Sequence, residues 1–134
     1  MLRYVVLRHE INPDSTNISG GASHWDLMLQ DEGKLLTWAI ERLPNLSKSD
    51  ELNAIPCKQL ARHRIEYLDY EGPISGDRGT VTRWDCGTFQ WKSRTTNELV
   101  AILSGEKLRG TITLAKAADL ETQPTWICTY QPEL

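Results

Sequence analysis

The sequence predicts a mainly β protein, an antiparallel sandwich or barrel, on two observations. Apolar and polar residues alternate in about eight short runs, and turn-forming residues separate these runs at close, regular spacing. This pattern is typical of antiparallel β folds rather than of α/β folds. Because the 134 residues show neither an internal repeat nor a low-complexity tract, we expect residues 1–134 to form a single domain with a real core.

The alternation predicts the strands in chain order. They are expected at residues 3–9, 23–30, 34–41, 60–71, 80–84, 88–91, 98–103, 108–114 and 125–130. Turn-forming residues predict tight hairpin connections at 31–33 and 85–87. The run at 98–103 fits helix or strand on periodicity alone, but the turn that follows at 104–107 favours a hairpin.

Three segments between these strands have other expectations. Residues 10–23 contain Asn-Pro-Asp-Ser and Gly-Gly and predict an exposed loop. Residues 47–53 and 116–121 could each form a short helical turn.

The composition is that of an ordinary soluble globular chain, with 25% charged and 40% hydrophobic residues. A net charge of −3 argues against a protein that coats long duplexes, although gripping one strand end needs only a few local cations. No apolar run is long enough to span a bilayer, and the first residues do not resemble a signal peptide. Three cysteines without CxxC spacing predict free thiols and a cytoplasmic location.

The second predicted strand carries the residues on which the functional reading is built. Successive side chains of a strand point to opposite faces, so Trp25, Leu27 and Leu29 share an apolar face that should pack. His24 and Asp26 share the other face and form half of a site for Zn, Mn or Fe. With 3 His and 18 acidic residues in the chain, about one such pair is expected by chance, so the pair alone is weak evidence.

The other two histidines decide whether this half-site can be completed. His9 ends the first strand and His63 lies in a later one, and a small barrel can bring such residues together in its interior or mouth. A set of two His and one Asp leaves metal positions open for water or substrate, as catalysis requires. The plainer alternative for His9 is a histidine at a strand end whose hydrogen bonds are all made within the protein. The plainer alternative for His63 is a surface histidine between Arg62 and Arg64.

Phosphate-binding groups are also present. Tyr67 lies four residues after His63 and on the same face if the strand is regular, so both could donate to a phosphoryl oxygen. The alternative is a core tyrosine with its hydroxyl at the rim. Guanidinium groups match phosphate geometry, and most of them are expected to be solvated surface groups. The candidate arginines are Arg8, Arg62, Arg64, Arg78 and Arg83.

Several segments in order resemble the 3′-phosphoesterase domain of bacterial ligase D. The run His24-Trp25-Asp26-Leu27-Met28-Leu29 is similar to that family's His-Tyr-Asp-Leu-Arg-Leu motif. The run from His63 to Gly72 is similar to its His-Pro-Leu-Glu-Tyr-Leu-Asp-Phe-Glu-Gly motif. Further similar segments lie at 4–10, 34–40, 79–81, 84–88 and 105–110, so that the resemblance covers about residues 3–116.

The resemblance implies a small antiparallel β-barrel with short flanking helices. It implies a divalent-metal-dependent hydrolase, with Mn most expected and Zn or Co as alternatives, whose metal ligands are His9, His24 and Asp26. The implied partner is the 3′ end of DNA or of a DNA/RNA primer-template. The implied reaction removes a terminal ribonucleotide and then the 3′-phosphate during DNA repair by non-homologous end joining.

By motif position, His63 and Tyr67 are the implied catalytic contacts to phosphate. The family has an arginine where this chain has Met28, and Arg62 or Arg64 could replace it as phosphate-binding residues. Because the sequence holds no ligase or polymerase segment, a stand-alone version that works with separate ligase and end-joining proteins is expected.

Two alternatives to the enzyme are kept. Met28 suggests a catalytically weak module that binds nucleic-acid ends or a partner. The third reading is an unrelated small-molecule barrel in which His24 and Asp26 line a pocket by accident.

Overall fold

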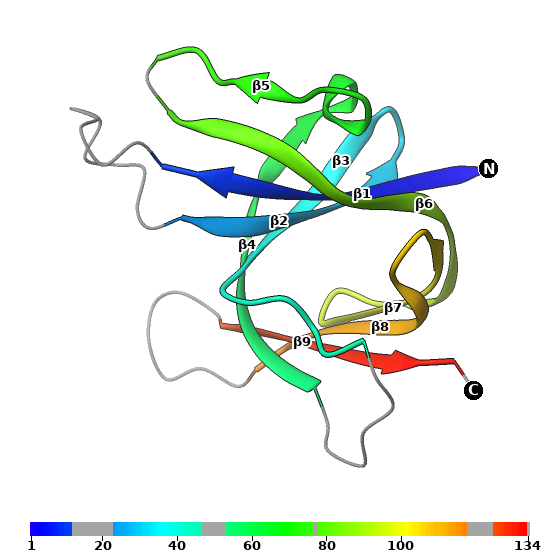
Figure 1. Cartoon of the computed structure of the whole chain (residues 1–134). Coiled ribbons are helices and arrows are strands. Elements are labelled where there is room, and N and C mark those ends of the chain that lie inside the picture. The colour runs from blue at the N-terminus through cyan, green and yellow to red at the C-terminus, as the bar shows by residue number, and fades with distance from the viewer. Residues whose placement is uncertain (12–22, 47–52, 77, 118–124, 134) are drawn as a thin grey trace.

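In a computed structural model, the chain folds as one antiparallel sheet of nine strands (Figure 1). The structure describes residues 1–11, 23–46, 53–76, 78–117 and 125–133. The elements are β1 (Leu2–Glu10), β2 (His24–Asp31), β3 (Lys34–Ile40), β4 (Asn53–Arg64), the 3-10 turn η2 (Ile65–Leu68), β5 (Gly72–Pro73), β6 (Thr80–Arg94), β7 (Glu98–Gly105), β8 (Arg109–Lys116) and β9 (Trp126–Pro132).

The sheet closes nearly into a ring, as expected for a barrel. The strand order is β1-β2-β3-β4-β9-β8-β7-β6-β5, and β1 also pairs with β6 (Figure 1). The long strand β6 makes this closure possible, because its first part pairs with β1 and its last part with β7. Within the described ranges the helical structure is limited to η2, so the flanking helices that the resemblance implied are not found there.

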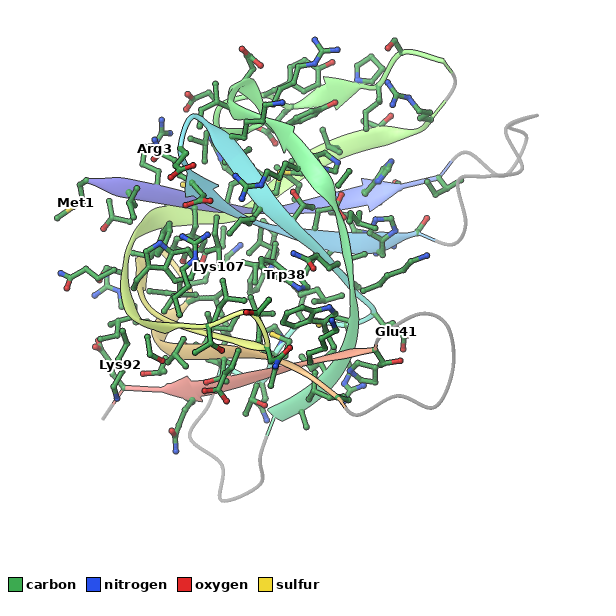
Figure 2. The ribbon with its side chains drawn as sticks, turned by 180° about the vertical axis from the view of Figure 1, so that it is seen from behind. Met1, Arg3, Trp38, Glu41, Lys92 and Lys107 are labelled. Carbon is green, nitrogen blue, oxygen red and sulfur yellow. The ribbon has the colours of Figure 1, made fainter. Side chains whose placement is uncertain are left out.

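The strands have two differently used faces. The inner face carries the main apolar core, in which Trp38 is fully buried between opposite parts of the ring (Figure 2). The outer face of β1, β2 and β3 carries a second, smaller cluster that includes Val5, Leu7, Met28 and Leu35. The segment from η2 to β5 lies over this outer face, above β1 and β6 in Figure 1. The outer face is therefore covered without belonging to the barrel interior.

Most of the predicted strands are confirmed with small shifts in their ends. The hairpin between β2 and β3 turns at Glu32 and Gly33, whose φ values of 49° and 81° lie in the left-handed region that the two-residue hairpin needs. The ambiguous run at 98–103 is strand β7, paired with β8 as the turn signal favoured. The predicted alternation of β2 also holds, since Leu27 and Leu29 are in the inner core.

Two strand predictions are wrong. The strand expected at 60–71 begins at Asn53 and ends at Arg64, where the chain enters η2, so Tyr67 is not on a strand. The hairpin expected at 85–87 does not form, because β6 continues from Thr80 to Arg94. The Asp85 carboxylate does not cap a turn of its own but accepts hydrogen bonds from the backbone N–H groups of Lys107 and Leu108.

Three other predictions fall wholly or mainly outside the described residues: the loop at 10–23 and the helical turns at 47–53 and 116–121. In the part of the chain that is described, no helix is long and apolar enough to cross a membrane.

A charged cluster joins three distant strands at the end of β2. Arg94 donates to both carboxylate oxygens of Asp31, at 2.8 and 3.0 Å, and Arg62 Nη1 lies 3.1 Å from Asp31 Oδ2. The bidentate contact with Arg94 lowers the pKa of Asp31 more than burial raises it, and Arg62 lowers it further. The ionised carboxylate is therefore the form that the fold stabilises.

Asp31→Asn is expected to lower the free energy of unfolding at pH 7 by about 1–2 kcal/mol, because both arginines are partly solvated and their attraction is screened. Because the pKa of Asp31 is lower in the folded protein than its ordinary value of 3.8, the ionised carboxylate stabilises the folded state at any pH above 3.8. This stabilisation is lost as the pH falls below 3.8 and through the lower pKa of the folded state. Urea unfolding at pH 7 and pH 3 should thus show a gap between wild type and variant that shrinks at pH 3. An equal gap at both pH values would contradict the ion-pair explanation.

Candidate metal centre and phosphate pocket

All three predicted metal ligands meet on the paired strands β1 and β2. His9 lies directly opposite His24 in the antiparallel ladder, and Asp26 follows two residues later on the same face. His24 Nε2 is 2.9 Å from Asp26 Oδ1, and His9 Nδ1 is 3.5 Å from Asp26 Oδ2. One ligand atom from each residue can be chosen so that all three lie within 4.8 Å of one another. The group is a possible metal-binding site.

The donor chemistry of the group fits a divalent cation. His9 Nε2 lies 2.7 Å from the carbonyl oxygen of Arg78, which can only accept, so Nε2 carries the proton. When this proton is on Nε2 of a neutral ring, Nδ1 carries a lone pair and lies 3.5 Å from Asp26 Oδ2. Nδ1 and the carboxylate oxygen are then two acceptors close together, an arrangement that favours a cation between them. Such a hydrogen bond to the remote ring nitrogen is the usual way in which a metal-ligating histidine is oriented.

The Asp26 side chain is buried, yet it remains suited to be an anionic ligand. Burial raises its pKa, but the contacts with His24 and His9 together lower it more, so that the net shift is downward. The fold therefore stabilises the ionised form of Asp26, which is the form that can bind a divalent cation.

A pocket of about 270 Å³ opens beside this group. Its lining contains six of the seven residues predicted for the site, while His24 lies next to it against Asp26. The lining residues are His9, Asp26, Met28, Arg62, His63, Arg64, Tyr67, Ile74, Arg78 and Val81.

Two different backbone features bring His63 and Tyr67 to the pocket, a β-bulge before His63 and the 3-10 turn that contains Tyr67. A bulge in β4 between the partners of Leu35 and Thr37 precedes His63, which pairs with Leu35 and so shares the outer face. His63 Nδ1 donates to the Ala61 carbonyl oxygen at 2.8 Å. The turn η2 then brings Tyr67 back over the strand, and the His63 and Tyr67 rings meet edge to face with centroids 5.7 Å apart. The two side chains are adjacent although the regular strand that was predicted to align them is absent.

The arginines at the pocket differ in their partners. Arg62 lines the pocket but is also ion-paired with Asp31. Among the described residues, Arg64 and Arg78 line the pocket without an ion pair to a carboxylate. Met28 also lines it and is buried at 1% exposure within the outer apolar cluster.

The site lies on the outer wall of the barrel, which corrects the expectation of a shared interior or mouth. His9 and His24 alternate with inward-facing core residues, and they share the outer face with Leu7 and Met28. The interior is filled by apolar side chains of the main core. The pocket is instead formed between this outer wall and the segment from η2 to the start of β6.

A family model for the DNA ligase D 3′-phosphoesterase domain matches residues 18–116. The chain belongs to this family. The matched range includes six of the seven predicted site residues, namely His24, Asp26, Arg62, His63, Arg64 and Tyr67. His9 lies before it, so the placement of His9 beside Asp26 is support that comes from the structure.

Relatives of this phosphoesterase domain are found within larger proteins. The chain is 30% identical over 118 residues to the multifunctional non-homologous end joining protein LigD of Pseudomonas aeruginosa, covering 82% of this chain. It is 30% identical over 100 residues to the proteins of that description from Mycobacterium bovis and Mycobacterium tuberculosis, covering 69% of this chain. The matches span 13% of the length of each of these relatives.

For this ligase D domain, sequence reasoning did not single out Arg78. It was one of five candidate arginines, whereas the structure places its carbonyl oxygen against His9 and its residue in the pocket. The sequence pattern likewise does not indicate that Ile74 and Val81 line the pocket. The glycines that flank Arg78 mark a turn, but the sequence carries no signal that this turn folds over β1.

Proposed function

We propose that this chain is a divalent-metal-dependent phosphoesterase that removes 3′-phosphates and 3′-terminal ribonucleotides from the ends of DNA or of DNA/RNA primer-templates. The observation that carries the proposal is one pocket whose lining includes His9 and Asp26 of the His-His-Asp group together with the adjacent His63 and Tyr67. Membership of the 3′-phosphoesterase domain family supports the same chemistry. The cellular setting proposed is DNA repair by non-homologous end joining, with separate ligase and end-joining proteins as partners and a cytoplasmic location.

His9, His24 and Asp26 would hold the metal, with Mn favoured and Zn or Co as alternatives. When bound, the metal would polarise the phosphoryl oxygens of the substrate. The chain itself orients the ligands, since Arg78 O fixes the His9 tautomer and the ladder between β1 and β2 fixes the spacing of the two imidazoles.

His63 and Tyr67 are proposed to stabilise negative charge on the phosphoryl group. The bond from His63 Nδ1 to Ala61 O leaves Nε2 as the ring nitrogen available to a substrate. A protonated His63 can donate from Nε2, and the Tyr67 hydroxyl is a second donor. The edge-to-face contact between the rings limits their movement, so these donors are positioned before the substrate arrives.

Arg62 and Arg64 are proposed as phosphate-binding residues. The Arg64 guanidinium has no carboxylate partner among the described residues and can turn to an anion at little cost. Arg62 would have to share its charge between Asp31 and the phosphate.

The test is phosphate release from a 3′-phosphorylated primer-template, with Mn²⁺ and with chelator. Release that depends on the metal is expected, and a matched 5′-phosphorylated strand serves as the control substrate. Elemental analysis of protein purified without chelator separates this proposal from the small-molecule barrel, which predicts neither bound metal nor affinity for nucleic-acid ends.

The second candidate is a binding module for nucleic-acid ends, favoured by Met28, a buried apolar residue in the pocket where the family has an arginine. Measurable binding of 3′ ends without turnover under any divalent metal would support it.

Met28→Arg is expected to raise kcat/KM for phosphate release by about tenfold, because a guanidinium makes charge-assisted bonds to the phosphoryl oxygens. The measurement is the steady-state rate with Mn²⁺, with circular dichroism to confirm folding. Met28→Leu is the matched control, since it keeps the apolar contacts and adds no charge. Equal rates for Met28→Arg and Met28→Leu would show that the missing arginine does not limit the reaction.

A further inference from the structure

A second pocket, of about 300 Å³, continues the first one away from the metal centre. The two pockets share four lining residues, Arg64, Tyr67, Ile74 and Arg78. The volume is at the lower end of small-molecule sites, which span roughly 300–1,000 Å³. The metal-side pocket and its neighbour thus form one track whose junction holds two guanidinium groups.

The far part of the track presents an aromatic face. Tyr70 is 38% exposed, although it is a large ring. Its hydroxyl donates to the Pro73 carbonyl oxygen, and its ring meets Tyr67 edge to face with centroids 5.8 Å apart. The ring is thus partly exposed while its hydroxyl bond and its contact with Tyr67 limit its movement, so that little side-chain entropy is lost when a base stacks on it.

The junction is positively charged and preorganised. Arg78 donates from Nε to the Ser75 carbonyl oxygen at 2.6 Å and from Nη2 to Ser75 Oγ at 3.2 Å. These bonds hold the side chain without neutralising it, and in the described ranges no carboxylate pairs with Arg64 or Arg78. Glu66 is the one carboxylate in the described lining of the second pocket, and it can accept from a sugar hydroxyl or a base amino group.

We propose that the second pocket binds the nucleotide preceding the 3′-terminal one, with its base on Tyr70 and the linking phosphodiester at Arg78 and Arg64. The inference rests on the proposed function and extends it. A metal-side pocket for the terminal phosphate, a cationic junction and an aromatic ring follow one another along the track. Read from its 3′ end, a strand presents in the same order its terminal phosphate, the phosphodiester that the terminal sugar joins to it, and the penultimate base. The inference adds to the proposed function a subsite for the penultimate nucleotide, which predicts that a dinucleotide is a better substrate than a mononucleotide or a small phosphomonoester.

The test compares kcat/KM with Mn²⁺ for thymidine 3′-monophosphate, for the 3′-phosphorylated dinucleotide d(TpTp) and for its analogue that lacks the penultimate base. Wild type is expected to prefer the dinucleotide by about tenfold or more over the mononucleotide. Tyr70→Leu should reduce this preference by about tenfold and have little further effect on the abasic analogue. Arg78→Ala should weaken both the dinucleotide and the analogue, because both keep the phosphodiester.

Arg42→Ala is the matched control, since it removes one positive charge outside both pockets and should leave the preference unchanged. Equal kcat/KM for mononucleotide and dinucleotide would overturn the inference while leaving the phosphoesterase intact. If neither these compounds nor the 3′-phosphorylated primer-template are hydrolysed, the proposed function fails, and calorimetric binding of the same three compounds decides the inference. Tighter binding of the dinucleotide that is lost in Tyr70→Leu would support it, and equal binding of all three would overturn it.

Discussion

Asp26→Asn is expected to lower both Mn²⁺ affinity and phosphate release by at least about 100-fold. The Asp26 carboxylate is buried and faces both imidazoles, so it is the anionic member of the proposed ligand set. An amide has the same shape but lacks the charge that attracts the cation. Calorimetric titration with Mn²⁺ measures the affinity directly, and phosphate release from the primer-template measures the activity.

A stability measurement gives this prediction a readout that does not depend on turnover. Mn²⁺ that binds the folded state should raise the Tm of wild type and not that of Asp26→Asn. Asp69→Asn is the matched control, because Asp69 is exposed, lies outside both pockets and pairs with Arg3. Wild-type Mn²⁺ affinity in Asp26→Asn would remove the metal centre from the proposal.

Asp85→Ala should be strongly destabilising although it lies outside the site, costing about 3–5 kcal/mol of unfolding free energy. Asp85 is 1% exposed and accepts from the Tyr4 hydroxyl at 2.6 Å and from the N–H groups of Lys107 and Leu108 at 2.8 and 3.0 Å. Burial first, and then the bond to Asp85, raises the pKa of Tyr4, so the phenol remains a donor. Alanine would leave several of these donors unsatisfied away from water.

Urea unfolding of Asp85→Ala, with Tyr4→Phe as comparison, tests this explanation. Tyr4→Phe removes one donor and leaves the two backbone bonds, so about 1 kcal/mol is expected. Gly105 packs so closely that a Cβ there would overlap the Tyr4 hydroxyl, which leaves no room for repacking around the network. A loss below 1 kcal/mol for Asp85→Ala would mean that solvent satisfies the two backbone groups.

The alternation of β2 was predictable because each residue there has the polarity that its face demands. Trp25, Leu27 and Leu29 turned to the core, and His24 and Asp26 to the other side, as two-residue periodicity required. The pairing of His9 with His24 was harder to predict, because the register of β1 on β2 depends on contacts between segments that are distant in sequence.

Two features were beyond local pattern for physical reasons. The run after His63 alternates like a strand, yet it turns into η2, where Leu68 is buried against the outer cluster. The burial of Leu68 against other segments therefore determines the conformation of this run, which is a 3-10 turn instead of a strand. Tyr67 still contacts His63, as the strand prediction expected, but it does so from the turn. Asp85-Cys86-Gly87 has turn-forming composition, but the Asp85 carboxylate serves the turn between β7 and β8 instead.

The main core and the reactive groups occupy opposite sides of β2, although Met28 on the reactive side also packs in the outer cluster. A library that randomises Trp25, Leu27 and Leu29 samples thermostability while the reactive groups keep their identities, and one directed at Met28 and its outward neighbours samples turnover on a fixed scaffold. Because the two sets of positions alternate along a single strand, their effects are expected to couple, and directed evolution of this domain should recombine both sets in one joint library.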